Sequence, residues 1–297
     1  MKILITGASG FLGGRIVERL NEEGHEVVVI GRSAPRQEHK PIFTQADIND
    51  KASLEACKNK HPNIDCVIHM AALVPKNKDE DQPEPMLQVN VQGTINILEV
   101  FGKDLQNFVY ASTAEVYGLP DANEPLAEDV VLPRPLSYYG ASKLAGEKFC
   151  QVYAAKHGLS VSILRYTVLY GPGDKINRAI PNFIKKALNG DDLKVFGGEE
   201  LRDYLHVYDA AEATCIVATK RVEGVLNIGT GEGISIKETA EQVAQLIDES
   251  GEISVLPREK KAADIVLNID KLQRLGFTPK YKFPELLEEQ IAWHKNN

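Results

Sequence analysis

The chain has 297 residues, of which 43% are hydrophobic and 26% are charged, a composition typical of a globular protein with a sizeable core. Lys and Arg number 34 and Asp and Glu number 42, so the formal net charge of −8 argues against a nucleic-acid partner. No apolar run approaches the ~20 residues of a membrane span, and the apolar start ends at Gly7, too early for a secretory signal. We therefore expect a cytoplasmic protein with no membrane partner.

Cysteine and histidine usage indicates neither disulfides nor a metal site. No CxxC pair occurs among the four cysteines, Cys57, Cys66, Cys150 and Cys215. We expect them to be buried free thiols in a reducing compartment. Three histidines are scattered with no ligand spacing: His25, His61 and His157.

Strand and helix patterns alternate along the first half of the chain. Short apolar, β-branched runs predict buried parallel strands at residues 3–6, 27–30, 66–69, 108–111 and 161–164, with a strand-like run at 43–46. Helical spacing of apolar residues predicts helices at 11–22, 86–100 and 143–155. This alternation predicts an α/β fold with a doubly wound parallel sheet and right-handed crossovers.

The rhythm changes after about Gly171, where Gly-Pro-Gly is followed by a helical pattern at 180–188 and a glycine pair at 197–198. We expect a Rossmann domain over 1–170 and a smaller, mixed α/β lobe over 171–297. A helical pattern at 206–218 and a strand at 225–228 suggest that parts of 205–230 return to the main sheet. Ligands of such sheets bind at the carboxyl ends of the strands, in a cleft that a second lobe could close.

A glycine-rich loop lies between the first predicted strand and the first predicted helix. Gly7 suits the tight turn, Gly10 allows close approach of a pyrophosphate, and Gly13 allows the helix to pack on the strand. The following helix N-terminus offers free N–H groups and partial positive charge to phosphates. The loop therefore predicts a dinucleotide site, with a purely structural glycine turn as the alternative.

The end of the second strand bears on the choice of dinucleotide. An acidic residue there would bind the ribose 2′-hydroxyl of NAD, but the chain has Gly31, Arg32 and Ser33. Arg32 and Ser33 could receive a 2′-phosphate, so the sequence favours NADP slightly over NAD. The alternative is a solvated arginine in a loop.

Tyr139 and Lys143 are four residues apart, which places a phenol and an ammonium on one face of a helix. The pair follows a strand that ends in the sequence Ala-Ser-Thr-Ala-Glu-Val-Tyr-Gly at 111–118. A YxxxK pair arises easily by chance, so its position after this strand matters more than its spacing. The alternative is that Tyr139 only packs and Lys143 forms a surface ion pair.

Almost the whole chain resembles the extended short-chain dehydrogenase/reductases, in their nucleotide-sugar epimerase/dehydratase branch. The motifs that carry the resemblance occur in order at residues 6–13, 46–48, 69–72, 90–94, 112–118, 139–143, 164–172 and 201–209. The resemblance implies a homodimer, an NAD or NADP cofactor and a nucleotide-diphosphate sugar as substrate.

The resemblance further implies that Tyr139 is the acid/base, that Lys143 is its electrostatic partner and a ribose ligand, and that Thr113 bonds the reacting sugar oxygen. A free phenol has a pKa of about 10, too high for a base near neutrality. One cation about 6 Å away, at an effective dielectric constant of about 20, is worth roughly 2.8 kcal/mol, or about two pKa units. With a positive nicotinamide added, we expect the Tyr139 pKa to approach 7.

Cofactor contacts implied by the resemblance are spread over the first 166 residues. They are Phe11 and Leu12 at the pyrophosphate, Asp47 and Ile48 at adenine, Met70, Ala71 and Ala72 along the ribose and nicotinamide, and Asn90 and Tyr166 nearby. Met70 and Ala72 could equally be core residues.

Residues 194–204 are similar to the nucleotide and diphosphate site of the sugar enzymes. Arg202 is the expected diphosphate ligand, because a guanidinium can bind two phosphate oxygens, and Phe196 lies in the same segment. An Arg202–Asp203 surface pair is the alternative. Arg258 and Lys261 lie where the family usually has another arginine, and Val168 replaces an asparagine that usually touches the phosphates, which puts the donor in doubt.

Hydride transfer at C4 of the sugar, by a 4-epimerase or a 4-ketoreductase, is the leading functional hypothesis. Glu115 follows Ala114, where several dehydratases carry an acidic pair, so a 4,6-dehydratase or decarboxylase remains an alternative. The others are a carbonyl reductase with a substrate that lacks a nucleotide, and a non-catalytic NADP-binding sensor.

Overall fold

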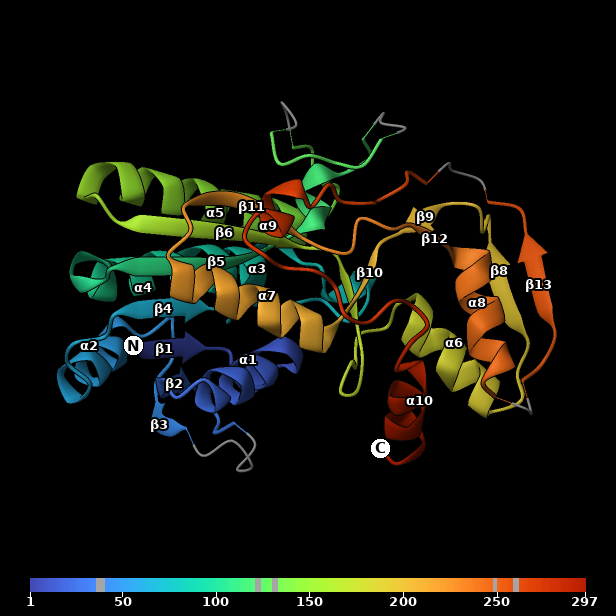
Figure 1. Cartoon of the computed structure of the whole chain (residues 1–297), viewed down its shortest axis with the longest axis horizontal. Helices are drawn as coiled ribbons and strands as arrows, with labels where there is room; N and C mark the ends of the chain where they lie inside the picture. The colour runs from blue at the N-terminus through green and yellow to red at the C-terminus, as the bar shows by residue number, and fades with distance from the viewer. Residues whose placement is uncertain (36–40, 121–123, 130–132, 248–249, 259–261) are drawn as a thin grey trace.

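The structure, a computed structural model, describes residues 1–35, 41–120, 124–129, 133–247, 250–258 and 262–297. At its centre is a seven-stranded sheet in the order β11-β6-β5-β4-β1-β2-β3, in which each neighbouring pair is parallel (Figure 1). The strands are β1 (Lys2–Thr6), β2 (Glu26–Gly31), β3 (Ile42–Gln45), β4 (Cys66–His69), β5 (Asn107–Thr113), β6 (Ser160–Tyr166) and β11 (Gly224–Ile228). The predicted α/β fold with a doubly wound parallel sheet is confirmed.

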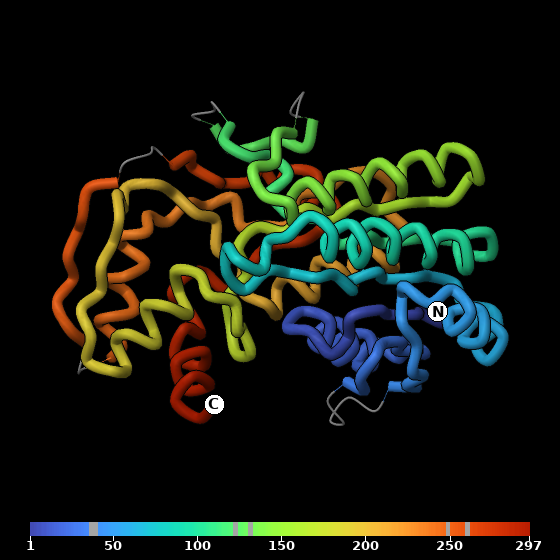
Figure 2. The backbone as a smooth tube through the Cα atoms, turned by 180° about the vertical axis from the view of Figure 1, so that it is seen from behind, coloured from blue at the N-terminus to red at the C-terminus, as the bar shows by residue number. Residues whose placement is uncertain are grey.

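Helices cover both faces of this sheet, which explains why its strands are almost continuously apolar. In the foreground of Figure 1 lie α1 (Phe11–Glu22), α7 (Val207–Lys220) and α9 (Asp270–Gln273). The opposite face, seen in Figure 2, carries α2 (Lys51–Lys60), α4 (Gly93–Phe101) and α5 (Tyr138–His157). Two separate hydrophobic clusters fill the space between the helices and the two faces.

Periodicity located most of these elements but missed an irregular helix. The predicted helix at 86–100 is three consecutive pieces, α3 (Pro83–Met86), a π-helix η3 (Leu87–Gln92) and α4. The wider π turn buries Asn90 and Val91. A 3.6-residue spacing does not reveal such a turn.

The predicted helix at 143–155 begins earlier, at Tyr138, because Ser137 caps it. The Ser137 hydroxyl accepts a hydrogen bond from the N–H of Gly140 at 2.9 Å. Within α5, a Cβ on Gly146 would lie 2.1 Å from the Tyr110 hydroxyl oxygen. Glycine at this position therefore lets the helix pack closely on β5.

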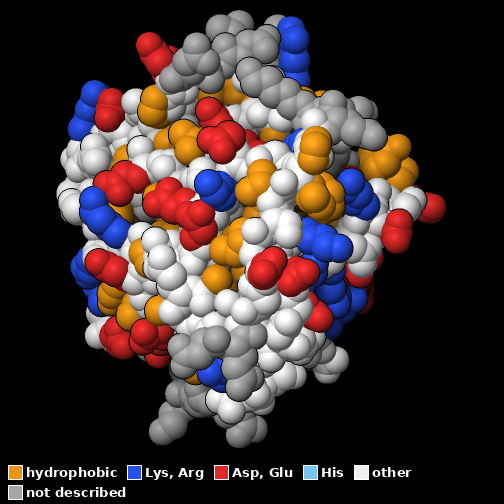
Figure 3. Space-filling view, turned by 90° about the vertical axis from the view of Figure 1, so that its right-hand side faces the viewer, with side chains coloured by type: hydrophobic (Ala, Val, Ile, Leu, Met, Phe, Trp, Pro, Cys, Tyr) orange, Lys and Arg blue, Asp and Glu red, His pale blue; other side chains and the backbone are white. Residues whose placement is uncertain are grey.

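The smaller lobe lies beyond the carboxyl ends of the central strands (Figure 1). Its elements are β7 (Val168–Tyr170), α6 (Ala179–Leu188), β8 (Leu193–Phe196), β9 (Leu201–Arg202), β10 (Tyr204–His206), β12 (Ile234–Ser235), α8 (Ile236–Gln245), β13 (Ile253–Leu256) and α10 (Leu287–Lys295). Its strand pairs are parallel (β10 with β7, β13 with β8) and antiparallel (β12 with β9), and a third hydrophobic cluster forms its core. On its outer face, Figure 3 shows positive, negative and hydrophobic side chains interspersed.

The chain passes between the main sheet and the smaller lobe more than once. α7 packs against α1 and leads to β11, the outer strand of the main sheet. Among the described residues, 3₁₀ turns also occur at η2 (Lys78–Glu80), η4 (Gly102–Asp104) and η5 (Ala114–Tyr117). The division at residue 170 stays a prediction.

All four cysteines are free and buried, as predicted. Burial raises the pKa of the Cys57 thiol to about 11 and that of Cys66 to about 12, so both thiols stay protonated and weakly nucleophilic. No helix among the described residues has the length and apolar character needed to cross a bilayer.

A buried ion pair fastens α5 to the sheet. Arg165 of β6 donates from Nε and Nη2 to the two carboxylate oxygens of Glu147 in α5, at 2.9 and 2.8 Å. The Glu147 side chain is 0% exposed and that of Arg165 is 4% exposed. Ser112 of β5 donates to the same carboxylate at 2.5 Å, so one side chain of α5 joins two strands.

Replacing Glu147 with Ala should destabilise the fold by about 3–5 kcal/mol, because it leaves the Arg165 charge buried and unpaired. Urea denaturation gives the free energy of unfolding. The matched control is Glu99→Ala, which breaks the exposed Lys51–Glu99 pair and should have little effect. Equal losses in the two variants would contradict this account of the anchor.

Candidate active site

The glycine loop forms a narrow turn between β1 and α1. Gly7 has φ of +73°, and a Cβ there would lie 2.6 Å from the Ala71 backbone nitrogen. A Cβ on Gly13 would lie 2.3 Å from the Gly7 carbonyl oxygen. Gly10 precedes α1 without a side-chain cap, and the first turn of α1 has no acidic residue. This cradle of bare backbone at a helix N-terminus fits the phosphates of a dinucleotide.

Residues expected at the adenosine end lie near the ends of β2 and β3. Arg32 and Ser33 are exposed, and the Arg32 carbonyl accepts a hydrogen bond from Gln45 at 3.2 Å. The Asp47 carboxylate accepts from the N–H of Asn49 at 2.9 Å, and Ile48 is buried. The structure thus places these residues at one edge of the sheet, and their contact with adenosine stays a prediction.

The strand end at Met70 is held by a buried chain of polar side chains. Thr94 donates to the Asn90 carbonyl, so it accepts from Nε2 of His69 at 3.1 Å. Nδ1 of His69 lies 2.8 Å from the Thr6 hydroxyl, which itself accepts from the N–H of Ala71 at 3.0 Å. Burial lowers the pKa of His69 to about 3, so this imidazole is neutral and structural.

Asn90, expected near the cofactor, has its carboxamide occupied by protein groups. It accepts from the N–H of Leu73 at 2.7 Å and donates to the Leu73 carbonyl at 3.1 Å and to Ser142 at 2.9 Å. It therefore holds the segment after β4 against α5. Met70, Ala71 and Ala72 in that segment are only partly buried, so none is a full core residue.

Thr113 and Glu115 lie where β5 ends. Thr113 Oγ1 accepts from the N–H of Glu115 at 3.3 Å, and the Glu115 carboxylate accepts from the Ser137 hydroxyl at 2.7 Å. Solvent reaches Glu115, yet desolvation by the surrounding atoms raises its pKa. The Ser137 hydrogen bond and the Arg178 charge oppose this rise, and the Asp81 charge adds to it.

Tyr139 and Lys143 lie together on α5, but the expected lowering of the Tyr139 pKa is wrong for the protein groups alone. Burial raises the pKa of Tyr139 well above its usual value, Glu115 raises it further, and the opposing cation is Arg178. Burial lowers the Lys143 pKa to about 8, with Glu147 opposing, and its ammonium lies 4.2 Å over the Tyr110 ring. The sequence estimate counted one cation and left out desolvation.

Arg178 is a site residue that sequence reasoning missed. It is the N-cap residue of α6 and forms an ion pair with Asp174 at 3.5 Å. Together with Arg202, Tyr204 and Val168 it lines a cavity of about 120 Å³. No short motif marks it in the sequence, because it reaches the site through the packing of α6.

Arg202 is half-buried at this cavity and donates to the carbonyls of Leu201 and Ala263 at 2.7 and 2.8 Å. The alternative of an Arg202–Asp203 surface pair is wrong. Asp203 is 0% exposed, and its carboxylate accepts hydrogen bonds from Thr230, Gly231 and Leu267.

The other expected contacts are more scattered. Phe196 is 56% exposed at the end of β8, and Arg258 forms an ion pair with Glu200. Lys261 lies outside the described residues. Tyr166 is buried and its hydroxyl bonds Thr214 of α7 at 2.7 Å, so this hydroxyl faces the helix. Roles for all four in binding stay predictions.

Comparison with known proteins identifies the family. Residues 3–229 match the NAD dependent epimerase/dehydratase family. The chain belongs to this family. The resemblance to extended short-chain dehydrogenase/reductases of the nucleotide-sugar epimerase/dehydratase branch is thereby confirmed, and NAD dependence is a property of the family.

Relatives within the NAD dependent epimerase/dehydratase family differ in their reactions. The chain is 33% identical to a UDP-N-acetyl-alpha-D-glucosaminuronate decarboxylase of Bacillus cytotoxicus, over 99% of this chain and 98% of the other. It is 32% identical to a UDP-glucose 4-epimerase of Halalkalibacterium halodurans, over 100% and 96%. The UDP-glucose 4-epimerase of Thermus thermophilus, solved in complex with NAD, superimposes with a TM-score of 0.87 at 31% identity over 99% of both chains.

Replacing Lys143 with Met should remove a pH dependence of stability. A lysine with a pKa of about 8 when folded, against 10.5 ordinarily, makes the fold gain stability as the pH rises through this window. The stability of K143M relative to the wild type should therefore fall by about 3 kcal/mol between pH 7 and pH 11. Urea denaturation of the cofactor-free protein at several pH values measures it; a constant difference would contradict the buried-lysine assignment.

Proposed function

We propose that this protein moves hydride at C4 of a nucleotide-activated sugar, as a 4-epimerase or a 4-ketoreductase that uses NAD or NADP. The observation that carries the proposal is an arrangement at one edge of the parallel sheet: the glycine cradle follows β1, Thr113 ends β5, and α5, which carries Tyr139 and Lys143, packs on β5. The family provides independent support, because its members here include UDP-glucose 4-epimerases.

Tyr139 is the proposed acid/base, and it takes the proton of the C4 hydroxyl as that carbon is oxidised. Thr113 bonds the same sugar oxygen and orients it. Lys143, with a pKa of about 8, is still largely charged at neutral pH and is the proposed electrostatic partner of the phenolate, in addition to Arg178, whose charge already lowers the Tyr139 pKa. When bound, the dinucleotide supplies the hydride acceptor and, in its oxidised form, a further positive charge.

The proposed pyrophosphate site is the backbone of the glycine loop, at the N-terminus of α1. It comprises Gly7, Gly10, Phe11, Leu12 and Gly13. The remaining proposed cofactor contacts extend from the adenine end to the nicotinamide: Arg32, Ser33, Asp47, Ile48, Met70, Ala71, Ala72, Asn90, Lys143 and Tyr166. NAD is named with the Thermus enzyme, whereas Arg32 is the reason to consider NADP.

The cavity shared by Arg178 and Arg202 is the proposed diphosphate site, because two guanidinium groups there suit an anion in an otherwise acidic protein. Since the relatives act on UDP-sugars, we propose a UDP-sugar as substrate. Val168 lines the same cavity, and its apolar side chain offers no hydrogen bond to a phosphate there. Phe196, Arg258 and Lys261 are proposed outer contacts.

Decarboxylation or elimination after oxidation is the second candidate. The raised pKa of Glu115 favours it, because a carboxyl that holds its proton longer can act as an acid near the sugar. A UDP-N-acetyl-alpha-D-glucosaminuronate decarboxylase is among the relatives. Release of CO2 from a UDP-uronate, or loss of water from a UDP-hexose, would select this candidate over the epimerase.

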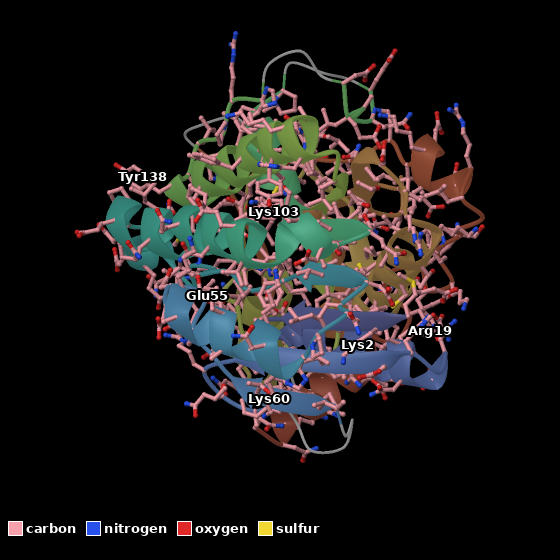
Figure 4. All side chains as sticks on the ribbon, turned by 90° about the vertical axis from the view of Figure 1, so that its left-hand side faces the viewer. Lys2, Arg19, Glu55, Lys60, Lys103 and Tyr138 are labelled. Atoms are coloured by element: carbon pink, nitrogen blue, oxygen red, sulfur yellow. The ribbon has the colours of Figure 1, made fainter. Side chains whose placement is uncertain are left out.

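A homodimer through α4 and α5 is also proposed. On this side Leu87, Phe149 and Val152 are large hydrophobic residues between 46% and 61% exposed. Tyr138 is 54% exposed, and Figure 4 shows it at the outer rim of the molecule. Buried free thiols suit the reducing cytoplasm, where we place the protein.

Replacing Tyr139 with Phe should abolish turnover while leaving dinucleotide binding intact, because only the hydroxyl that moves the proton is lost. Turnover is measured by product analysis over a panel of UDP-hexoses and UDP-uronates with NAD or NADP, and binding by titration of NADH fluorescence. Thr113→Val, which removes the orienting hydroxyl, serves as a graded comparison with a smaller loss expected. Near-normal turnover in Y139F would remove the proposed mechanism.

Replacing Arg32 with Ala tests the choice of dinucleotide. If Arg32 receives a 2′-phosphate, the affinity for NADPH should fall by about tenfold or more, the loss of one charge-assisted contact, while that for NADH stays nearly constant. Titration of both reduced dinucleotides against the wild type and R32A decides it. An equal change for both would refute the NADP assignment and leave NAD as the cofactor.

A further inference from the structure

The first turn of α5 is capped by a carboxylate from a distant part of the chain. Asp81 Oδ2 accepts from the N–H of Tyr138 at 3.0 Å, and Oδ1 accepts from the N–H of Tyr139 at 2.8 Å. Ser137 takes the next N–H, that of Gly140. The first N–H groups of a helix have no partner within the helix, so these three acceptors complete its N-terminus. A carboxylate at this end is also favoured by the helix dipole.

Local sequence provides only part of this cap. Ser137 satisfies one N–H, and the two that remain belong to Tyr138 and to the proposed acid/base, Tyr139. Without Asp81 these two groups would turn to water, and the first turn of α5 would fray more readily. The Tyr139 backbone is thus fixed by a residue 58 positions away in sequence.

The loop that carries Asp81 is itself ordered by side-chain hydrogen bonds. Asn77 Oδ1 accepts from the N–H groups of Asp79 and Glu80 at 3.0 and 3.1 Å, which caps η2. The Glu80 carboxylate accepts from the N–H of Lys76 at 3.0 Å, and the N–H of Asp81 bonds the Lys78 carbonyl at 3.3 Å. The carboxylate therefore approaches α5 from a preformed turn.

The same loop also contacts the segment before α6. The N–H of Asn177 donates to the Lys76 carbonyl at 3.3 Å, and Asn177 is the neighbour of Arg178. Residues 76–81 thus connect the first turn of α5 to the segment that carries the cation acting on Tyr139. Asp81 lies at the α5 end of this connection.

We propose that Asp81 is a positioning residue, which fixes the Tyr139 backbone at the start of α5 and thereby the reach of the phenol into the site. This inference rests on the proposed role of Tyr139. In the part of the chain that the structure describes, the Asp81 carboxylate bonds the backbone N–H groups of Tyr138 and Tyr139, and it is assigned no part in proton or hydride transfer. Its negative charge also contributes to the raised pKa of Glu115.

The test compares D81N and D81A with the wild type. D81N keeps one acceptor oxygen and D81A keeps none, so the loss of rate should be larger in D81A than in D81N. We expect the rate per bound NAD to fall about 10- to 100-fold in D81A, the effect of a misplacement of about 1 Å, and less in D81N. The KM for the UDP-sugar should stay within about twofold, because the diphosphate site is unchanged. Expressing the rate per bound NAD removes any change in the folded fraction.

The matched control is D79N, which removes the same charge from the same exposed loop without touching α5. Its rate should equal that of the wild type. Backbone hydrogen exchange of residues 138–141, followed by mass spectrometry, should be faster in D81N and D81A only. An unchanged rate per bound NAD in D81A, or an equal fall in D79N, would overturn the proposal.

Failure of the proposed function is distinguishable from failure of this inference. If Y139F is inactive and D81A is fully active, only the Asp81 assignment is overturned. If the wild type turns over none of the UDP-sugars, the proposed function fails, and hydrogen exchange still decides whether Asp81 caps α5.

Discussion

The position of α5 on the sheet is the constraint on which the candidate site depends. The Glu147–Arg165 pair holds this helix to β6, and Gly146 lets it lie directly against Tyr110 of β5. Lys143 is one helical turn from Glu147, so the register of the ion pair also sets the register of the ammonium. Because a buried charge cannot be left unpaired, intermediate positions of the helix are strongly disfavoured.

Burial favours the neutral form of both groups that α5 brings to the site. It raises the pKa of the Tyr139 phenol and lowers that of the Lys143 ammonium, so each is shifted toward its neutral form. Low polarity at the site also strengthens every remaining charge interaction. A cationic or anionic ligand that enters would therefore change the protonation of these side chains more than it would on an open surface.

The fold and the tight turn of the glycine loop were largely predictable from the sequence, since they follow from local patterns. Short apolar runs located the strands, and the glycine spacing matched a turn in which Gly7 and Gly13 have no room for a Cβ. Asp81 and Arg178 were not predictable, because each acts on α5 across a large separation in sequence. The direction of the Tyr139 pKa was also missed, since desolvation depends on the atoms packed around a group.

The π-helix η3 has a consequence for how this segment can evolve. A π turn contains about one residue more than an α-helical turn, and η3 joins α3 to α4 without a break. Deleting one residue from Leu87–Gln92 would restore regular geometry and rotate α3, with the loop before it, by about 100° about the helix axis relative to α4. Loop 76–81 would then face away from α5. We therefore expect homologous chains to tolerate exchanges of side chains here far better than changes in length.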